Sequence, residues 1–368
     1  MTSGGRACFT ERLLDWAASN GRSGLPWHPI EGRPPDPYLV WVSETMLQQT
    51  QLVTMLPYFE RFVRRFPNCE ALARAPLDEV LSAWSGLGYY ARARNLHRAA
   101  QSIDLAGSFP ASAAAWEALA GVGRSTAAAI SAVVHNERVA ILDGNVRRVL
   151  ARQVCAPEPW ASKALADRLW VEAAARLPVD SHHMPAYTQA IMDLGATVCL
   201  PRQPRCEACP VSAHCDSRRA GRVEDFPVPR RPRVRPVRRV GWIVAWQAGR
   251  VALLQQPPRG VWGGLWVLPS WPLTSGWPKQ AGIVRSFHHE FTHFRLEVSW
   301  ACVAIETRDP ILTAISQDPV GAGVDIASTP EVTWMHPDDA ASRGLPKPVR
   351  EVLEVSQGLV LRGSGGEP

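Results

Sequence analysis

Apolar residues recur every three or four positions from residue 9 to about residue 196. In the segment 84–100, for example, apolar side chains at this spacing alternate with arginines. This period is typical of amphipathic helices, and the two-residue alternation of strands is almost absent. Prolines fall between the apolar segments, where they start or stop a helix. The pattern predicts an all-helical domain over residues 1–217.

The pattern changes towards the C-terminus, where short runs of β-branched and aromatic residues are separated by Gly and Pro. These runs cover residues 240–246, 251–254, 265–268 and 296–305. Runs of this kind predict strands. We expect a small α+β domain over 239–358 with a mostly antiparallel sheet and a closing helix from about Lys347 to Gln357. The end of the chain, 359–368, is expected to fray, and the segment 310–329 has no readable pattern.

An Arg- and Pro-rich segment, 218–238, lies between the two predicted domains. It packs no core and is typical of a semi-rigid linker. The chain carries a formal charge of +6, and from Phe226 to His289 ten Lys or Arg stand against no Asp or Glu. This distribution favours contact with a polyanion, the alternative being a basic surface without a ligand.

No apolar run approaches the roughly 18 residues that span a bilayer, so a protein without membrane segments is expected. The N-terminus lacks the basic start, apolar middle and cleavage site of a secretory signal. We therefore expect a reducing, cytoplasmic location, next to the nucleoid if the polyanion is DNA. No repeat or heptad pattern suggests self-association, and a monomer is the default expectation.

Four of the eight cysteines crowd into one short stretch with the spacing C-x6-C-x2-C-x5-C: Cys199, Cys206, Cys209 and Cys215. Clustering favours ligation over disulfides. Four thiolates suit a [4Fe–4S] cluster or a tetrahedral zinc ion. Zinc sites usually use two C-x2-C pairs and this chain has one, which favours iron. Four unrelated buried cysteines are the remaining alternative.

The segment LAGVGRSTAAAISAVV, 119–134, joins the end of one predicted helix to the start of another through Gly121 and Gly123. Glycines at a helix N-terminus let backbone N–H groups approach a phosphate closely. The segment is typical of a helix-hairpin-helix. It lacks the G-x4-G-K-[ST] spacing of a nucleotide-binding loop, while a helix-turn-helix without a ligand stays open.

Two acidic residues suggest chemistry. Glu44 lies in the apolar segment YLVWVSETMLQQTQ, which predicts burial, and a buried Glu has a raised pKa and can donate a proton near neutral pH. Asp143 directly precedes a helix that begins near Asn145. Taken singly, each is also explained as a helix cap or a satisfied buried acid. Together, a proton donor and a carboxylate that stabilises a cationic sugar are what glycosidic-bond cleavage requires.

The chain resembles the MutY-type adenine DNA glycosylases of the endonuclease III superfamily. The matching blocks are LPW (25–27), SETMLQQTQ (43–51), WSGLGYYARARNL (84–96), GVGRSTAAAI with DGNVRRVLAR (121–130 and 143–152), AIMDLGATVC (190–199), GLWVLPSW (264–271) and FTHF (291–294). The resemblance implies a helix-hairpin-helix domain with a [4Fe–4S] cluster and a Nudix-like C-terminal domain. It implies removal of adenine mispaired with 8-oxoguanine, or with G, after the adenine is flipped out of double-stranded DNA.

The resemblance also implies roles for individual residues. Glu44 protonates the adenine ring, Asp143 stabilises or traps the oxocarbenium ion, and Asn145 supports that site. The other implied positions are Trp27 and Gln189 in the adenine pocket, Gln49 and Tyr89 as wedges in the duplex, Gly121, Gly123, Arg124 and Ser125 in the DNA-binding hairpin, and Phe291, Thr292 and His293 in 8-oxoguanine recognition.

Ser125 stands where lyases of the superfamily carry a nucleophilic lysine, and a serine cannot form the Schiff base of β-elimination. We therefore expect a monofunctional glycosylase that leaves an intact abasic site. The C-terminal domain lacks the clustered glutamates that hold Mg²⁺ in Nudix hydrolases, so no pyrophosphatase activity is expected. The rival functions are a non-catalytic DNA-binding protein and an endonuclease III-like lyase acting on oxidised pyrimidines.

Overall fold

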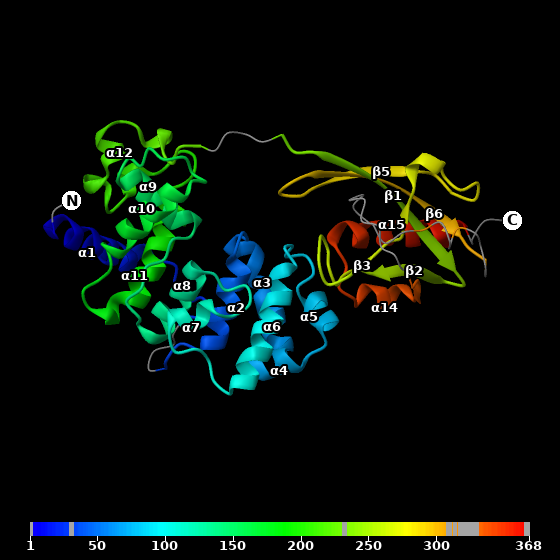
Figure 1. Ribbon diagram of the computed structural model, residues 1–368, viewed down its shortest axis with the longest axis horizontal. Helices are drawn as coiled ribbons and strands as arrows, with labels where there is room; N and C mark the ends of the chain where they lie inside the picture. Colours follow the sequence, from blue (N-terminus) through cyan, green and yellow to red (C-terminus); the bar gives the residue numbers. More distant parts are fainter. Residues whose placement is uncertain are drawn as a thin grey trace. The chain divides into compact units, whose positions relative to one another are not determined.

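The computed structural model describes residues 3–28, 33–229, 234–306, 311, 315 and 331–363 (Figure 1). Contacts between Cα atoms divide the chain into two compact units. The first unit comprises Met1–Ala73 and Arg98–Pro232, and the second comprises Arg74–His97 and Arg233–Pro368. Each unit is described by itself below. Within the described ranges, no helix is both long and apolar enough to cross a membrane.

The first unit is helical, which confirms the prediction for this part of the fold. Its helices are α1 (Ser3–Asn20), α2 (Pro37–Leu47), α3 (Leu52–Arg65), α4 (Cys69–Arg74), α7 (Ala113–Glu117), α8 (Arg124–His135), α9 (Gly144–Gln153), α10 (Lys163–Ala174), α11 (Met184–Asp193) and α12 (Asp216–Arg219). The residues of helix α6 (Ala91–Ala106) are divided between the two units, with those up to His97 in the second and those from Arg98 in the first.

Helix α2 shows how the sequence determines the centre of this unit. Asp36 caps its start by accepting a hydrogen bond from the Tyr38 N–H, and Pro37 occupies the first turn, where its missing N–H costs nothing. The helix is apolar on almost every side, with Trp41 only 1% exposed. A helix of this kind must be surrounded by others, and α2 packs against α3 and α8.

The second unit contains an α+β fold built on a mixed sheet. Its described strands are β1 (Val237–Gln247), β2 (Arg250–Gln255), β3 (Trp266–Val267), β4 (Ser270–Trp271), β5 (Arg285–Glu290), β6 (Arg295–Ala304) and β7 (Thr333–Met335). The main order is β3-β2-β1-β6-β5, while β4 pairs with β1 and β7 with β2. All pairs are antiparallel except the long parallel pair of β1 and β6, which run side by side with β5 (Figure 1).

Two helices complete the sheet domain, α14 (Pro337–Ala341) and α15 (Lys347–Gly363). Helix α15 begins where the sequence predicts and continues six residues beyond the expected end at Gln357. The expected strand at 265–268 is shorter, because only Trp266 and Val267 pair as a strand. Most of the segment 310–329 and the final residues 364–368 lie outside the described part of the chain.

The second unit also includes a helical segment from the N-terminal half, with α5 (Leu77–Ala83) at its centre. The Trp266 indole N–H donates to an Asp78 carboxylate oxygen at 3.2 Å. The Ser85 hydroxyl donates to the Leu345 carbonyl oxygen at 3.0 Å. Hydrogen bonds and packing therefore join residues 74–97 to the sheet domain, although the chain reaches that domain only after residue 232.

Candidate active site

A cavity of about 810 Å³ opens in the first unit and brings together most of the residues predicted for the reaction. The predicted residues that line it are Trp27, Glu44, Ser125, Asp143, Asn145 and Gln189. These residues come from the segment before α2, from α2 itself, and from α8, α9 and α11. The volume falls in the range of small-molecule sites.

Glu44 lies in the last turns of α2, where the helix ends at the cavity. Burial and, to a smaller extent, the nearby Asp143 carboxylate together raise the pKa of Glu44 to about 7, while Arg22 opposes the shift. One helical turn later, the Gln48 amide donates to the Thr126 hydroxyl at 3.2 Å and links α2 to α8. At neutral pH a large fraction of Glu44 is therefore protonated and able to donate a proton.

Asp143 is the N-cap of α9, and its Oδ1 accepts a hydrogen bond of 2.8 Å from the Val146 N–H. Burial raises the pKa of Asp143, whereas backbone hydrogen bonds from Val146 and Asn145 lower it. The guanidinium groups of Arg148 and Arg22 lower it as well. The capping role and a catalytic role are thus both compatible with this carboxylate, which faces the same cavity as Glu44.

Arg148 is a cavity residue to which the sequence reasoning assigned no role. Its Nη2 donates to the Asn145 Oδ1 at 2.9 Å and to the Gly195 carbonyl oxygen at 2.8 Å. Its Nε donates to the Cys199 carbonyl oxygen at 2.8 Å. Gly195 permits the close packing of Asn145 on this segment, because a Cβ at Gly195 would lie 2.6 Å from the Asn145 Cβ. Arg148 therefore fixes Asn145 against the start of the cysteine segment.

A second group missed from the sequence lies beside Gln189. The Gln189 amide donates to Asp193 Oδ1 at 2.7 Å, and Asp193 is fully buried and paired with Arg22 at 2.5 Å. His28 hydrogen-bonds to the side chain of Gln189. Trp27, 5% exposed, contacts Phe59 edge to face at 5.1 Å between ring centroids. The orientation of the Gln189 amide is consequently fixed from two sides.

The predicted hairpin precedes α8. Gly121 has a φ of +77°, a conformation that favours glycine, and Gly123 is the N-cap of α8. A Cβ at Gly123 would meet no atom within 4 Å, so packing inside the protein does not require glycine there. Ser125 accepts a hydrogen bond from the Leu142 N–H at 2.9 Å, and Arg124 stacks on Trp170 at 3.9 Å.

The two predicted wedge residues share an unusual backbone conformation. Gln49, exposed after the end of α2, has a φ of 59°, and Tyr89, half-exposed, has a φ of 49°. Residues other than glycine adopt this region at an energetic cost, and it recurs at functional sites. Gln49 belongs to the first unit and Tyr89 to the second. Neither side chain lines the cavity that contains Glu44.

Tyr89 instead lines a cavity of about 480 Å³ in the second unit together with Phe291, Thr292 and His293. The hydroxyl groups of Tyr89 and Thr292 lie 3.3 Å apart. Phe291 stacks on Phe294 with ring centroids 4.5 Å apart. The predicted lesion-reading residues and one predicted wedge thus form a single surface.

Two aromatic side chains that the sequence reasoning left without a role support Phe291. The His289 ring contacts Phe291 edge to face at 4.8 Å, and the Trp262 ring lies 5.3 Å from Phe291. Both residues line the same cavity as Tyr89. Burial lowers the pKa of His289, so that its neutral form is favoured. Phe291 is therefore held on two sides by side chains that precede it in the chain.

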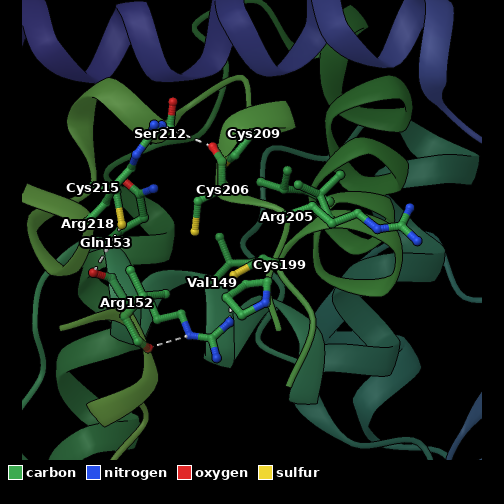
Figure 2. A pocket seen from close by; sticks show the side chains of 14 residues that line it. Val149, Arg152, Gln153, Cys199, Arg205, Cys206, Cys209, Ser212, Cys215 and Arg218 are labelled. Atoms are coloured by element: carbon green, nitrogen blue, oxygen red, sulfur yellow. Dashed lines mark hydrogen bonds between the residues drawn. The ribbon is translucent and has the colours of Figure 1, made fainter. Parts of the chain in front are cut away.

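The four clustered cysteines line one cavity at the end of the first unit (Figure 2). All four are free thiols, and the Sγ atoms of Cys199, Cys206 and Cys215 face a common space in Figure 2. Burial and the neighbouring cysteines raise the pKa of Cys209 to about 12. Four thiolates would thus repel one another here unless positive charge lay among them, which fits a cationic iron or zinc group.

Among the described residues, no group of three or more His, Cys, Asp or Glu side chains is arranged to hold a single metal ion. In a [4Fe–4S] cluster each thiolate binds a different iron, so the thiolates need not converge on one point. The cavity also has basic walls, since Arg152 and Arg218 line it. The residues present fit a cluster.

Comparison with known proteins agrees with this architecture. Residues 42–172 match the family model of the HhH-GPD superfamily base excision DNA repair proteins, and residues 240–355 match that of the NUDIX domain. A solved thermostable thymine-DNA glycosylase is similar in fold, with a TM-score of 0.52 at 24% identity, over 59% of this chain and 98% of that one. The fold and site therefore define a helix-hairpin-helix repair enzyme with a C-terminal Nudix domain.

Relatives of known name identify the family to which the chain belongs within this class. An adenine DNA glycosylase of Buchnera aphidicola subsp. Schizaphis graminum is 30% identical over 94% of this chain and 98% of that protein. The mouse adenine DNA glycosylase is 38% identical over 61% of this chain and 44% of its own length. The chain belongs to the adenine DNA glycosylase family, enzymes of base excision repair that hydrolyse N-glycosyl bonds. The resemblance inferred from the sequence motifs is confirmed.

Proposed function

We propose that the chain removes adenine mispaired with 8-oxoguanine, or with G, from duplex DNA and leaves an intact abasic site. The observation that carries the proposal is that Glu44 and Asp143 line one cavity with Gln189, while Ser125 occupies the wall where a lyase needs an amine. The adenine, flipped from the duplex, would enter this cavity. Trp27 would pack against its ring.

Glu44 would act as the general acid. The pKa of about 7 keeps much of its carboxyl group protonated at neutral pH, and transfer of that proton to N7 lets adenine leave as a neutral base. Gln189 would read the Watson–Crick or Hoogsteen edge of the base through an amide that Asp193 and His28 hold in one orientation.

Loss of the base leaves positive charge on the sugar, and Asp143 would stabilise that oxocarbenium ion as a carboxylate. Burial raises the pKa of Asp143, while two backbone hydrogen bonds and the guanidinium groups of Arg148 and Arg22 oppose this shift and favour the carboxylate. Asn145, held by Arg148, would support the sugar or the attacking water from the adjacent position. The two proposed roles therefore require different protonation states of Glu44 and Asp143, whose carboxyl groups face the same cavity.

DNA would be held by the hairpin and by two wedges. The open space at Gly123 admits a phosphate close to the backbone N–H groups that begin α8, with Gly121 shaping the turn and Arg124 adding positive charge. Gln49 and Tyr89 would replace lost stacking in the duplex. Phe291, Thr292 and His293 would then contact the 8-oxoguanine that the adenine leaves behind.

Substrate choice tests the proposal directly. The purified protein should release adenine fastest from A opposite 8-oxoguanine, more slowly from A opposite G, and should leave thymine glycol intact. The measurement is single-turnover base release from three duplexes of otherwise identical sequence. Excision of thymine glycol would favour the lyase alternative, and binding without any release would favour a non-catalytic DNA-binding protein.

A monofunctional reaction has its own signature. Because Ser125 carries no amine, the product strand should remain continuous until alkali or heat is added. Borohydride present during the reaction should trap no covalent complex between protein and DNA. Both are read on a denaturing gel beside a lysine-dependent lyase as the positive control. A strand break without alkali, together with a trapped adduct, would contradict the assignment.

The four cysteines would hold a [4Fe–4S] cluster that closes the end of the helical unit. When bound, the cluster supplies a rigid anchor for the loop that contains the exposed Arg202 and Arg205, which would then contact the DNA backbone. The chemical step itself requires no residue of this loop.

Replacement Cys199→Ser removes one of the four predicted ligands, so it should lower thermal stability and DNA affinity together. Iron analysis and the visible absorption of the wild-type protein distinguish iron from zinc. The matched control is Cys302→Ser, since Cys302 is a free thiol in the second unit. Normal DNA affinity in a metal-free Cys199→Ser protein would refute the anchoring role.

A further inference from the structure

Arg152, in the last turn of α9, is 2% exposed, and its guanidinium group is directed at main-chain oxygens. Its Nε donates to the carbonyl oxygens of Val223 and Phe226 at 3.1 and 2.8 Å. Its two terminal nitrogens donate to Leu200 at 2.7 Å and to Pro201 at 3.2 Å. Leu200 and Pro201 lie at the start of the cysteine segment, 199–215, whereas Val223 and Phe226 follow its end. One side chain therefore ties the start of the segment to the chain that follows it.

The same guanidinium also contacts a sulfur atom. Arg152 Nη1 lies 3.3 Å from Cys199 Sγ, and the Arg152 carbonyl oxygen accepts hydrogen bonds from Cys215 Sγ and from the Ser217 hydroxyl. Figure 2 shows Arg152 reaching towards Cys199 from beside the cavity. Arg152 therefore contacts the first and the last of the four predicted ligands.

Arg218 lines the same cavity and provides a contrast. Its Nη1 donates to the Cys206 carbonyl oxygen at 3.0 Å, and its Nη2 pairs with the exposed Glu207 carboxylate at 2.9 Å. Its contacts are thus with a backbone oxygen and with a surface acid. Arg152 and Arg218 share a charge and a cavity, but they differ in whether the guanidinium contacts a ligand sulfur.

The surroundings of Arg152 explain what this contact does. Carbonyl oxygens satisfy the donors of a buried guanidinium but supply only partial negative charge, and burying a cation is costly without a counter-charge. A cluster bound by four thiolates carries net negative charge. An N–H···S hydrogen bond from a cation stabilises the more reduced, more negative state of such a cluster and so raises its reduction potential.

We propose that Arg152 is a positioning residue with two separable roles. Its guanidinium fork holds the cysteine segment closed around the cluster, and its Nη1 contact with Cys199 Sγ biases the cluster towards its reduced state. The inference rests on the cluster proposed above and concerns a buried residue that does not line the cavity of Glu44. It assigns to α9 a second function, because Asp143 at its start and Arg152 near its end serve different centres.

Two substitutions separate the two roles. Arg152→Gln removes both charge and fork, whereas Arg152→Lys keeps the charge and loses the fork geometry. Arg218→Gln is the matched control. For each holoenzyme, the cluster midpoint potential is measured at an electrode, which supplies or removes the electron, and the rate of iron release is measured with an iron chelator.

Arg152→Gln should lower the midpoint potential enough to change the ratio of oxidised to reduced cluster about tenfold at fixed potential, about 59 mV for one electron. It should also speed iron release at least tenfold. Arg152→Lys should release iron as quickly while its potential stays closer to that of the wild type. Arg218→Gln should change the potential less than Arg152→Gln does, because the Arg218 charge is paired with Glu207 and no hydrogen bond to a ligand sulfur is lost.

Several results would overturn the inference. Equal potentials in Arg152→Gln and Arg218→Gln would remove the electrostatic role, and equal rates of iron release would remove the closing role. If Arg152→Gln fails to fold, Arg152→Lys still tests both roles. Iron release as slow as in the wild type would contradict the closing role, and a potential shifted by as much as about 59 mV would contradict the role of the charge. Absence of iron from the wild-type protein would refute the cluster itself. Wild-type potential and iron release in the Arg152 variants would instead refute only the role of Arg152.

Discussion

Glu44→Gln should bind duplexes with A opposite 8-oxoguanine as tightly as the wild type and release adenine roughly 10²- to 10⁴-fold more slowly, the usual contribution of a general acid. Glutamine preserves the size of the side chain and its position on α2, but it has no proton to transfer to the base. The measurement is single-turnover adenine release beside a binding titration with the same DNA. The exposed Glu60→Gln, on α3, is the matched control.

The pH dependence gives an independent check of this role. Glu44 must be protonated to act, so with a pKa of about 7 the wild-type rate should be sustained below pH 7 and should fall as pH rises through that value. The residual rate of Glu44→Gln should lack this alkaline decline. Turnover close to the wild-type rate in Glu44→Gln would show that another group supplies the proton.

Asp143→Asn is expected to lower adenine release by roughly 10²- to 10³-fold with little change in thermal stability. Asparagine caps a helix about as well as aspartate, so its Oδ1 can still accept the Val146 N–H hydrogen bond. The negative charge that would stabilise the sugar cation is lost. Melting temperature and single-turnover rates, measured on the same samples, separate the two roles of this side chain.

Asp143→Ala supplies the contrast, because it should lose both the rate and about 1 kcal/mol of stability from the missing cap. Removing the Asp143 charge should also lower the pKa of Glu44, since that carboxylate contributes to its elevation. The alkaline decline of the remaining activity should then begin at a lower pH. A normal rate in Asp143→Asn would leave helix capping as the whole explanation of this residue.

Much of this fold is readable from the sequence because many of the longer helices and most long strands carry their own apolar period. The exception is β5, which was not predicted: its residues from Arg285 to Glu290 are exposed or only partly buried, so no apolar alternation marks it. The parallel pairing of β1 and β6 was equally unreadable. Local pattern identifies a strand, while its neighbour depends on contacts between distant parts of the chain.

The candidate site divides in the same way. Glu44 and Asp143 were identifiable because an acid inside an apolar segment, or before a helix, is unusual for its context. Arg148 and Arg152 were not, since arginines on an amphipathic helix normally face solvent. Their partners are mostly backbone carbonyl oxygens within the cysteine segment or close to its two ends, which no pattern of side chains reveals. Spacing offered one usable signal, because Asn145 and Arg148 are three apart on α9 and so share a face.

Because residues 74–97 belong to the second unit, no single cut in the chain separates the two units. The HhH-GPD match covers residues 42–172 and therefore includes this segment, although its packing partners include Trp266 and Leu345. A chain cut at the linker would keep the segment and lose those partners. The C-terminal half therefore does not contain the whole second unit, because residues 74–97 of that unit precede the hairpin in the chain.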